Sequence, residues 1–302
     1  MFGKSRQAYY QRKKYIFKQE VKSEILLQLI ARERKYMPRL GGRKLLKRIH
    51  SKLPEELQIG RDALFNFLRE ENLLVRRRKY KARTTYSNHW LHKYPNLIQA
   101  FTAQKANELW VSDITYIPTE EGFAYLSLLT DAYSRKILGW NVASTLEAIH
   151  SVKALKMALK QLPSKTENVY HHSDRGVQYC SDEYVKNLNK RNFQISMTES
   201  SDPRDNAIAE RVNGIIKDEW VNQMHFTTKD EARIKMNEII RIYNSMRPHS
   251  SVDMLTPETA HNQTGELKKH WKNYWKQKIL SQNQMESSIF VKQKELRILN
   301  TL

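Results

Sequence analysis

The sequence predicts an α/β protein, a mixed β-sheet with helices on its faces, preceded by an all-α region. Between residues 105 and 265, apolar runs of strand length alternate with helical periods in the order βββαβαβαα. Residues 1–85 show helical spacing alone, and the positive charge is concentrated outside the alternating region. We therefore divide the chain into a helical region over 1–85, a linker over 86–104, an α/β core over 105–265 and a basic tail over 266–302.

The amino-terminal region is predicted to form three helices. Apolar residues recur at helical spacing over 8–34, 43–51 and 61–74, and Pro38 and Gly60 mark breaks between these runs. Two short basic helices separated by a turn are typical of a helix-turn-helix, whose second helix lies in the major groove of DNA. Any small three-helix bundle would give the same pattern, so both interpretations stay open from these residues.

A dense basic run follows the third predicted helix. It contains Arg76, Arg77, Arg78 and Lys79. A segment with this charge is suited to follow the phosphate backbone of DNA, so we expect these side chains to contact DNA. The alternative is a solvated, charged loop.

The core is predicted to begin with three antiparallel strands. These strands are expected over 108–117, 124–129 and 136–142, and Asp131 lies in the turn between the last two. The remaining core elements alternate helices with short strands: helices over 145–162, 182–192, 206–221 and 228–245, and strands over 168–172 and 194–197.

Two of these helices carry start signals. Ser181 is expected to cap the helix that begins at residue 182. Thr228 and Glu231 have the form of a capping box at the start of the last helix.

The charge balance points to nucleic acid. The 302 residues carry a formal net charge of +20. Residues 1–85 hold 24 Lys and Arg against 8 Asp and Glu, residues 266–302 hold 8 against 3, and the region between is nearly neutral. Basic flanks suit binding to a phosphate backbone, and double-stranded DNA is the expected partner. The tail could form a helical contact with DNA or a second copy, or be partly disordered.

Composition also excludes several classes of protein. No apolar run reaches the ~18 residues of a membrane span, and the first residues lack the apolar stretch of a signal peptide. Cys180 is the single cysteine, so neither a disulfide framework nor a four-cysteine zinc site is expected. We expect no membrane association and a reducing, cytoplasmic location.

Three acidic residues stand in short polar contexts within the core. Asp113 lies inside a predicted strand, Asp174 follows another, and Glu210 lies in a predicted helix, with 35 residues between Asp174 and Glu210. A carboxylate in a central strand is costly for packing alone, because a buried charge needs a partner. Three carboxylates brought together can hold two Mg²⁺ ions, which can drive phosphoryl transfer on nucleic acid.

A lysine stands seven residues after the third carboxylate. Seven residues are nearly two helical turns, so Lys217 and Glu210 share a helix face. We expect Lys217 to contact a DNA phosphate near the cut. The alternative is an ordinary exposed lysine.

Other polar residues near these motifs have two interpretations. His171 and His172 are expected to be structural or to orient neighbouring groups, because Mg²⁺ prefers oxygen ligands. Asn206 is as easily a helix cap as a catalytic group. Arg247 could hold DNA or simply stabilise the turn at Pro248.

Five short motifs occur together in the core. They are Trp110–Tyr116 (W-x-x-D-I-T-Y), His172–Tyr179 (H-S-D-R-G-V-Q-Y), Asp205–Glu210 (D-N-A-x-x-E), Tyr243–His249 and Leu255–Glu258. With the 35-residue spacing and Lys217, they resemble the integrase core of DDE transposases, and in particular the second-reading-frame product of IS3-family insertion sequences. Gly41–Leu45 and the predicted helix over 61–74 resemble the amino-terminal helix-turn-helix of that family.

The resemblance implies a ribonuclease-H-like fold, dependence on two Mg²⁺ or Mn²⁺ ions, 3′-end cleavage at the inverted repeats of an element, and strand transfer. It implies that Asp113, Asp174 and Glu210 are the catalytic residues and the metal ligands. Arg43 and Lys44, in the helix-turn-helix motif, are then expected to contact DNA. Further expectations are a homo-oligomer on DNA, fusion with or a partner from an upstream reading frame, and a location in the bacterial cytoplasm at the nucleoid.

Two other functions compete with this one. A non-catalytic DNA-binding regulator of transposition would need only the basic amino-terminal region. A ribonuclease-H-type nuclease would share the fold and the metals, but it has no use for long basic flanks. Three retained carboxylates favour the transposase over the regulator.

Overall fold

A computed structural model of the chain describes residues 6–75, 90–99, 101–199 and 205–270. Four expected DNA contacts lie outside the described residues: Arg76, Arg77, Arg78 and Lys79. Residues 271–302 of the tail lie outside them as well.

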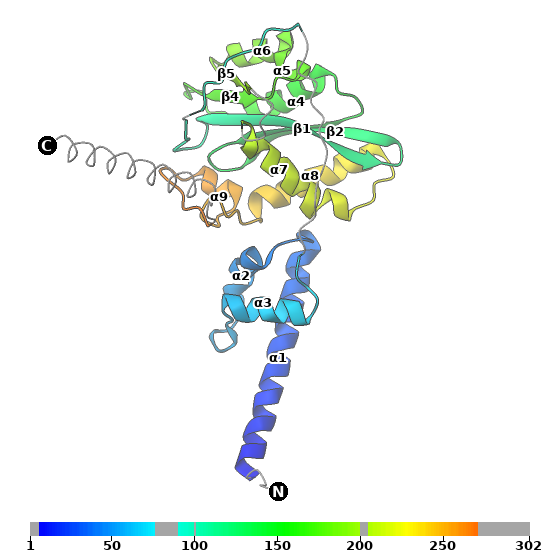
Figure 1. Cartoon of the computed structure of the whole chain (residues 1–302), viewed down its shortest axis with the longest axis vertical. Helices are drawn as coiled ribbons and strands as arrows, with labels where there is room; N and C mark the ends of the chain where they lie inside the picture. Colours follow the sequence, from blue (N-terminus) through cyan, green and yellow to red (C-terminus); the bar gives the residue numbers. More distant parts are fainter. Residues whose placement is uncertain (1–5, 76–89, 100, 200–204, 271–302) are drawn as a thin grey trace, which may run out of the picture.

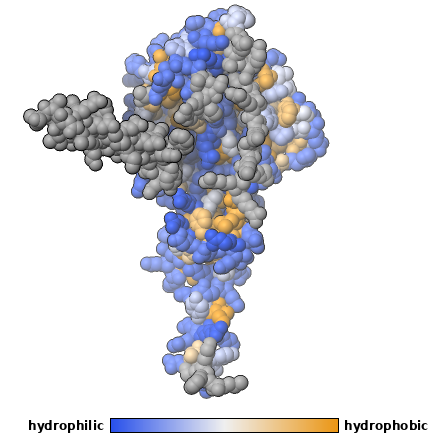
Figure 2. Space-filling model, viewed as in Figure 1, coloured by the Kyte–Doolittle hydropathy of each residue, from blue (hydrophilic) through white to orange (hydrophobic). Residues whose placement is uncertain are grey.

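The amino-terminal region is helical, as predicted. It comprises α1 (Arg6–Tyr36), α2 (Gly42–His50), the 3₁₀-helix η1 (Glu55–Leu57) and α3 (Arg61–Glu70). Figure 1 shows α1 extending past α2 and α3, away from the sheet. The surface of this extension is mostly hydrophilic in the space-filling view (Figure 2).

Helix α3 is shorter than predicted. It ends at Glu70 because Asn72 adopts a φ of 56°, the left-handed conformation that commonly terminates helices. The backbone N–H of Leu73 then donates to the carbonyl oxygen of Leu68 at 2.7 Å. Leu73 and Leu74 still pack against the apolar core, which explains why the helical period continues past the helix end.

The core contains a five-stranded mixed sheet. Its strands are β1 (Leu109–Thr119), β2 (Gly122–Asp131), β3 (Ile137–Ala143), β4 (Tyr170–Ser173) and β5 (Gln194–Met197). They lie in the order β3-β2-β1-β4-β5. The first three pair antiparallel, whereas β1 with β4 and β4 with β5 pair parallel. The predicted mixed sheet, with three antiparallel strands first, is confirmed.

Helices cover both faces of this sheet (Figure 1). One face carries α4 (Ala148–Leu159), α5 (Val177–Cys180) and α6 (Asp182–Asn189), and the other carries α7 (Ala207–Glu219) and α8 (Lys229–Ser245). The sequence does not predict α5, the 3₁₀-helix η2 (Val221–Gln223) or α9 (Pro257–His261). Within the described residues, no helix is long and apolar enough to cross a membrane.

Side chains of β1 alternate between the two faces. Trp110 packs with apolar side chains of α4 and α6, whereas Val111 packs with Ala209 of α7. This period of two sends every second residue of β1, including Asp113, toward the α7 face.

The predicted helix caps have different outcomes. The Thr228 hydroxyl accepts a hydrogen bond from the Glu231 N–H, as a capping box requires, and Glu231 accepts in return from the N–H of Thr227. Ser181 is the N-cap residue of α6, as predicted, but it makes no side-chain cap hydrogen bond, and its hydroxyl donates to the carbonyl of Gln178. The position of the cap was predicted correctly, whereas the expected hydrogen bond is not formed.

The carboxyl end of α7 contacts the helical region and the end of α8. The indole N–H of Trp220 donates to the carbonyl of Tyr36 at 2.8 Å. Glu219 accepts two hydrogen bonds from the buried guanidinium of Arg247, at 2.6 and 2.7 Å, and lies 3.6 Å from the Lys44 ammonium. Burial alone would raise the pKa of Glu219, but these cations outweigh it and hold the pKa below its ordinary value.

The contact between β3 and α4 predicts a large effect of one methyl group. A Cβ added to Gly139 would lie 2.0 Å from the carbonyl oxygen of Ala154. We expect Gly139→Ala to lower the free energy of unfolding by ~3 kcal/mol, because the helix must move off the sheet. Urea denaturation monitored by circular dichroism measures this.

Gly214 is the matched control. It is exposed on α7, and an added Cβ there meets nothing within 4 Å. Gly214→Ala should raise the free energy of unfolding by about 0.5–1 kcal/mol through helix propensity. Equal effects of the two substitutions would contradict the packing described for β3 and α4.

Candidate active site

Two of the three carboxylates are placed by the parallel pairing of β1 with β4. The register joins Leu109 to Tyr170 and Val111 to His172. Asp113 and Asp174 each stand two positions beyond that last pair. Because residues two apart on a strand share a face, Asp113 leaves the sheet on the α7 side. Asp174, one residue past the end of β4, lies close enough for its charge to raise the pKa of Asp113.

Helix α7 supplies the third carboxylate. It packs on β1, where the Asn213 amide nitrogen donates to Oδ2 of Asp113 at 2.8 Å. Glu210 lies three residues before Asn213, on the same side of the helix. Asp113 is half-buried, whereas Glu210 is exposed at the amino-terminal end of α7.

The pKa of Asp113 is raised by its burial and by the neighbouring carboxylates. Burial raises it first, and the negative charge of Asp174 raises it further. Hydrogen bonds from Asn213 and from the N–H of Ile114 oppose the rise, while Glu210 adds to it. The result is a pKa of about 7 against an ordinary 3.8, as expected where carboxylates share one site.

Asp174 is held by the turn that follows β4. Its Oδ1 accepts the N–H of Gly176 at 3.0 Å. A Cβ on Gly176 would lie 3.0 Å from the same oxygen, so a larger residue would push the carboxylate aside.

Lys217 lies on the Asp113 side of α7, as its spacing predicts. Its ammonium stands 3.7 Å from the centre of the Tyr116 ring on β1, and the side chain is 8% exposed. Burial lowers the pKa of Lys217, while the negative charge of Asp113 opposes that change. The site therefore contains a cation close to its carboxylates, held by an aromatic face.

Three other residues that were expected to contact DNA differ in their exposure to solvent. Arg43 is exposed on α2, and its guanidinium donates to the carbonyl of His270 at 3.5 Å. Lys44 is largely buried beside Glu219, and burial lowers its pKa to about 8. Arg247 has no exposed surface and is bound by Glu219. A side chain without exposed surface cannot reach a phosphate, so we propose a structural role for Arg247.

The two histidines before Asp174 are buried and neutral. Nε2 of His171 lies 2.9 Å from the hydroxyls of Ser112 and Tyr184, and Nδ1 of His172 lies 2.8 Å from the Ser196 hydroxyl. Burial lowers their pKa values to about 3 and about 4. Both rings therefore support the strands, in line with the structural expectation.

Asn213 is the site residue that sequence reasoning missed. Its position three residues after Glu210 places it on the face of α7 that was already assigned to Glu210 and Lys217, and this spacing could have revealed it. Asn206, considered as a cap, makes no side-chain cap; its amide nitrogen donates to the carbonyl of Ser112 at 3.0 Å. It thereby attaches the start of α7 to β1.

The donor set suits a hard divalent cation. Carboxylate oxygens are the ligands that Mg²⁺ and Mn²⁺ prefer, and Asp113, Asp174 and Glu210 supply them from three separate elements. Across the described residues, no three His, Cys, Asp or Glu side chains are already arranged around one ion position. Two carboxylates are instead held by protein N–H groups, which offset their mutual repulsion.

Comparisons with known proteins identify the family of the chain. Integrase core domain families match residues 103–203 and 191–257. An uncharacterized 31 kDa protein of insertion element IS600 from Shigella sonnei is 36% identical over 216 residues, which are 70% of this chain and 78% of that protein. The transposase InsF for insertion sequence IS3A from Escherichia coli K12 is 34% identical over 197 residues, which are 65% and 68% of the two chains.

The chain belongs to the IS3-family transposases. Its core has a ribonuclease-H-like fold. Among solved structures it is similar to the magnesium complex of the HTLV-2 integrase catalytic core domain, at 17% identity and a TM-score of 0.42, over 53% of this chain and all of that one. A simian T-cell lymphotropic virus intasome structure gives 14% identity and a TM-score of 0.45, over 68% of each chain.

The raised pKa of Asp113 predicts a pH-dependent stability in the absence of metal. Between pH ~4 and ~7 the folded protein keeps a proton that the unfolded chain has released, so the free energy of unfolding falls as the pH rises. Asp113→Asn removes this titrating group, so the free energy of unfolding should change less with pH. A tenfold change in proton affinity corresponds to ~1.4 kcal/mol. The fall in the free energy of unfolding between low and high pH should therefore be ~2–4 kcal/mol larger in the wild type than in Asp113→Asn.

Urea denaturation in EDTA at pH 5 and pH 7.5, on both proteins, measures the difference. A similar loss of stability in Asp113→Asn would show that other groups cause it.

Proposed function

We propose that this transposase cleaves the 3′ ends of an insertion sequence and joins them to target DNA, with Asp113, Asp174 and Glu210 as its catalytic and metal-binding residues. The observation that carries the proposal is the grouping of these carboxylates by β1, β4 and α7, with their combined effect on the pKa of Asp113.

Each residue has a distinct task. When bound, two Mg²⁺ or Mn²⁺ ions supply a polarised nucleophile and neutralise charge on the phosphate. Asp113 is the most constrained ligand, because Asn213 and the Ile114 N–H orient its oxygens. Asp174 is oriented by Gly176. Glu210 is exposed at the start of α7, where a bound substrate can reach it.

The chemistry consists of two phosphoryl transfers. In the first, a water oxygen bonds to phosphorus at the element end, and the bond from phosphorus to the 3′ oxygen breaks, so the strand ends in a hydroxyl. In the second, this hydroxyl bonds to a target phosphorus and loses its proton, and the target strand leaves with a new 3′ hydroxyl. Lys217 supplies a positive charge beside the phosphate in both steps.

The partners follow from the charge. The basic amino-terminal region and the exposed Arg43 suit double-stranded DNA at the element ends, and we propose that Arg76–Lys79 follow its backbone. We also propose a homo-oligomer that holds two ends, a possible contribution from an upstream reading frame, and action at the bacterial nucleoid. A non-catalytic regulator would leave the grouped carboxylates without a purpose.

A cleavage and joining assay on the element's ends tests this proposal. Glu210→Gln should lose more than ~10³-fold in both rates in Mg²⁺, as expected when one member of a catalytic set is removed, while DNA binding is retained. Glu238→Gln, on the exposed side of α8, is the matched control and should act like wild type. Equal activity of Glu210→Gln and wild type would refute the assignment.

A further inference from the structure

A pocket of about 470 Å³ lies beside the candidate active site. Its floor is Leu109 and Val111 of β1, and one wall is residues 205–208 at the start of α7. The other wall is formed by Asn96, Ile98, Gln99 and Phe101. This volume lies within the ~300–1,000 Å³ of ordinary ligand sites. The catalytic roles assigned above use none of these residues.

The pocket and the catalytic carboxylates share one face of the sheet. Leu109, Val111 and Asp113 are alternate residues of β1, so all three point toward α7. Two strand residues span about 6.6 Å, which places the pocket floor next to Asp113. A DNA phosphate held at Asp113 would therefore carry its neighbouring nucleotide to the pocket.

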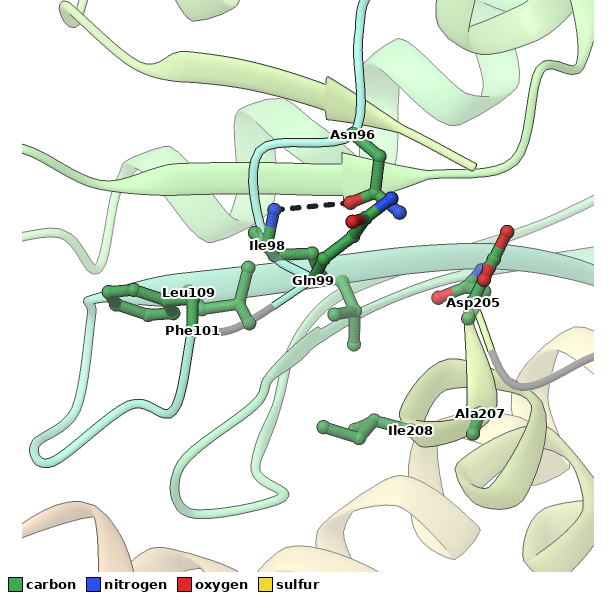
Figure 3. Close-up of a pocket in the computed structure, with 10 residues that line it drawn as sticks. Asn96, Ile98, Gln99, Phe101, Leu109, Asp205, Ala207 and Ile208 are labelled. Carbon is green, nitrogen blue, oxygen red and sulfur yellow. Dashed lines mark hydrogen bonds between the residues drawn. The ribbon is translucent and has the colours of Figure 1, made fainter. Parts of the chain in front are cut away.

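Polar groups stand around an apolar interior. Figure 3 shows the amides of Asn96 and Gln99 on one side and Asp205 on the other. The Asn96 oxygen accepts the N–H of Ile98, and the Gln99 nitrogen donates to Glu199. Asn96 is thus left with an amide donor, whereas Gln99 and Asp205 supply acceptors.

The charge of the pocket limits the ligands that it can hold. Asn206, which also lines it, is 5% exposed, and its Oδ1 is fully covered, so the groups that a ligand can reach are those of Gln99 and Asp205. The carboxylate of Asp205 argues against phosphate in this space and favours a neutral group that donates hydrogen bonds.

We propose that this pocket receives a nucleobase with an exocyclic amino group, from the nucleotide next to the phosphate that is cut. The inference rests on the proposed function of the carboxylates. The apolar floor and Ile208 contact the base, and the acceptors of Gln99 and Asp205 receive its amino group. Removing this base from the stack exposes the phosphate to the half-buried Asp113 and makes cleavage sensitive to the base at one position.

Fluorescence of 2-aminopurine tests base capture directly. The probe is placed at each position around the cleaved phosphate in duplex oligonucleotides carrying the element's ends, and bound to Asp113→Asn protein, which separates capture from cutting. We expect a several-fold rise in fluorescence at one position, because unstacking relieves quenching. No rise at any position would overturn the proposal.

Cleavage by a pocket-filling variant provides the second test. Ile208→Phe should cleave intact DNA at least ~10-fold more slowly than wild type, matching the ~1–3 kcal/mol of one base contact. It should cleave DNA with an abasic site at that position as wild type does. Gln99→Leu, which adds no bulk, should show the same pattern.

Ile234→Phe, at a side chain 68% exposed on α8, is the control and should be unaffected. An equal defect of Ile208→Phe on intact and abasic DNA, or no defect at all, would overturn the proposal. If neither the wild type nor any variant cleaved DNA, that result would count against the proposed function. The fluorescence experiment alone would then show whether the pocket receives a base.

Discussion

The parallel pairing of β1 with β4 is the constraint on which the site depends. It brings Asp174 beside Asp113, although a crossover through β2, β3 and α4 separates them in the chain. A helix packed on the face that Asp113 leaves can then add a third carboxylate. Helix α7 does so, and its far end is bound to Arg247, Lys44 and Tyr36. The helix that carries Glu210 is therefore held at both ends.

Grouping three carboxylates lowers stability, and the surrounding residues offset part of that loss. Asn213 and the backbone N–H groups of Ile114 and Gly176 donate to the two aspartates, and Lys217 adds a positive charge. These groups reduce the repulsion between the carboxylates. The arrangement is typical of functional sites, where local stability is given up for binding capacity.

The sequence was informative wherever a local pattern determines structure. The strands around Asp113 and Asp174 and the helix around Glu210 follow from periodicity, so the carboxylates could be identified. The contact of Asn213 with Asp113 depends on how α7 sits on β1, which no local pattern encodes. Arg247 was a candidate DNA contact because no local pattern shows that its guanidinium binds Glu219, which lies 28 residues earlier in the chain. Likewise, Asn96, Ile98, Gln99 and Phe101 fall within the predicted linker, yet they line a pocket.

The central claim is that β1, β4 and α7 build one divalent-metal site. Anomalous diffraction from crystals of the full chain soaked in Mn²⁺ tests it most directly, because it locates the ion without assuming any activity. The account predicts manganese between the carboxylates of Asp113, Asp174 and Glu210, and none there in Asp113→Asn. Manganese bound elsewhere, or no manganese at these carboxylates at saturating concentration, would contradict it.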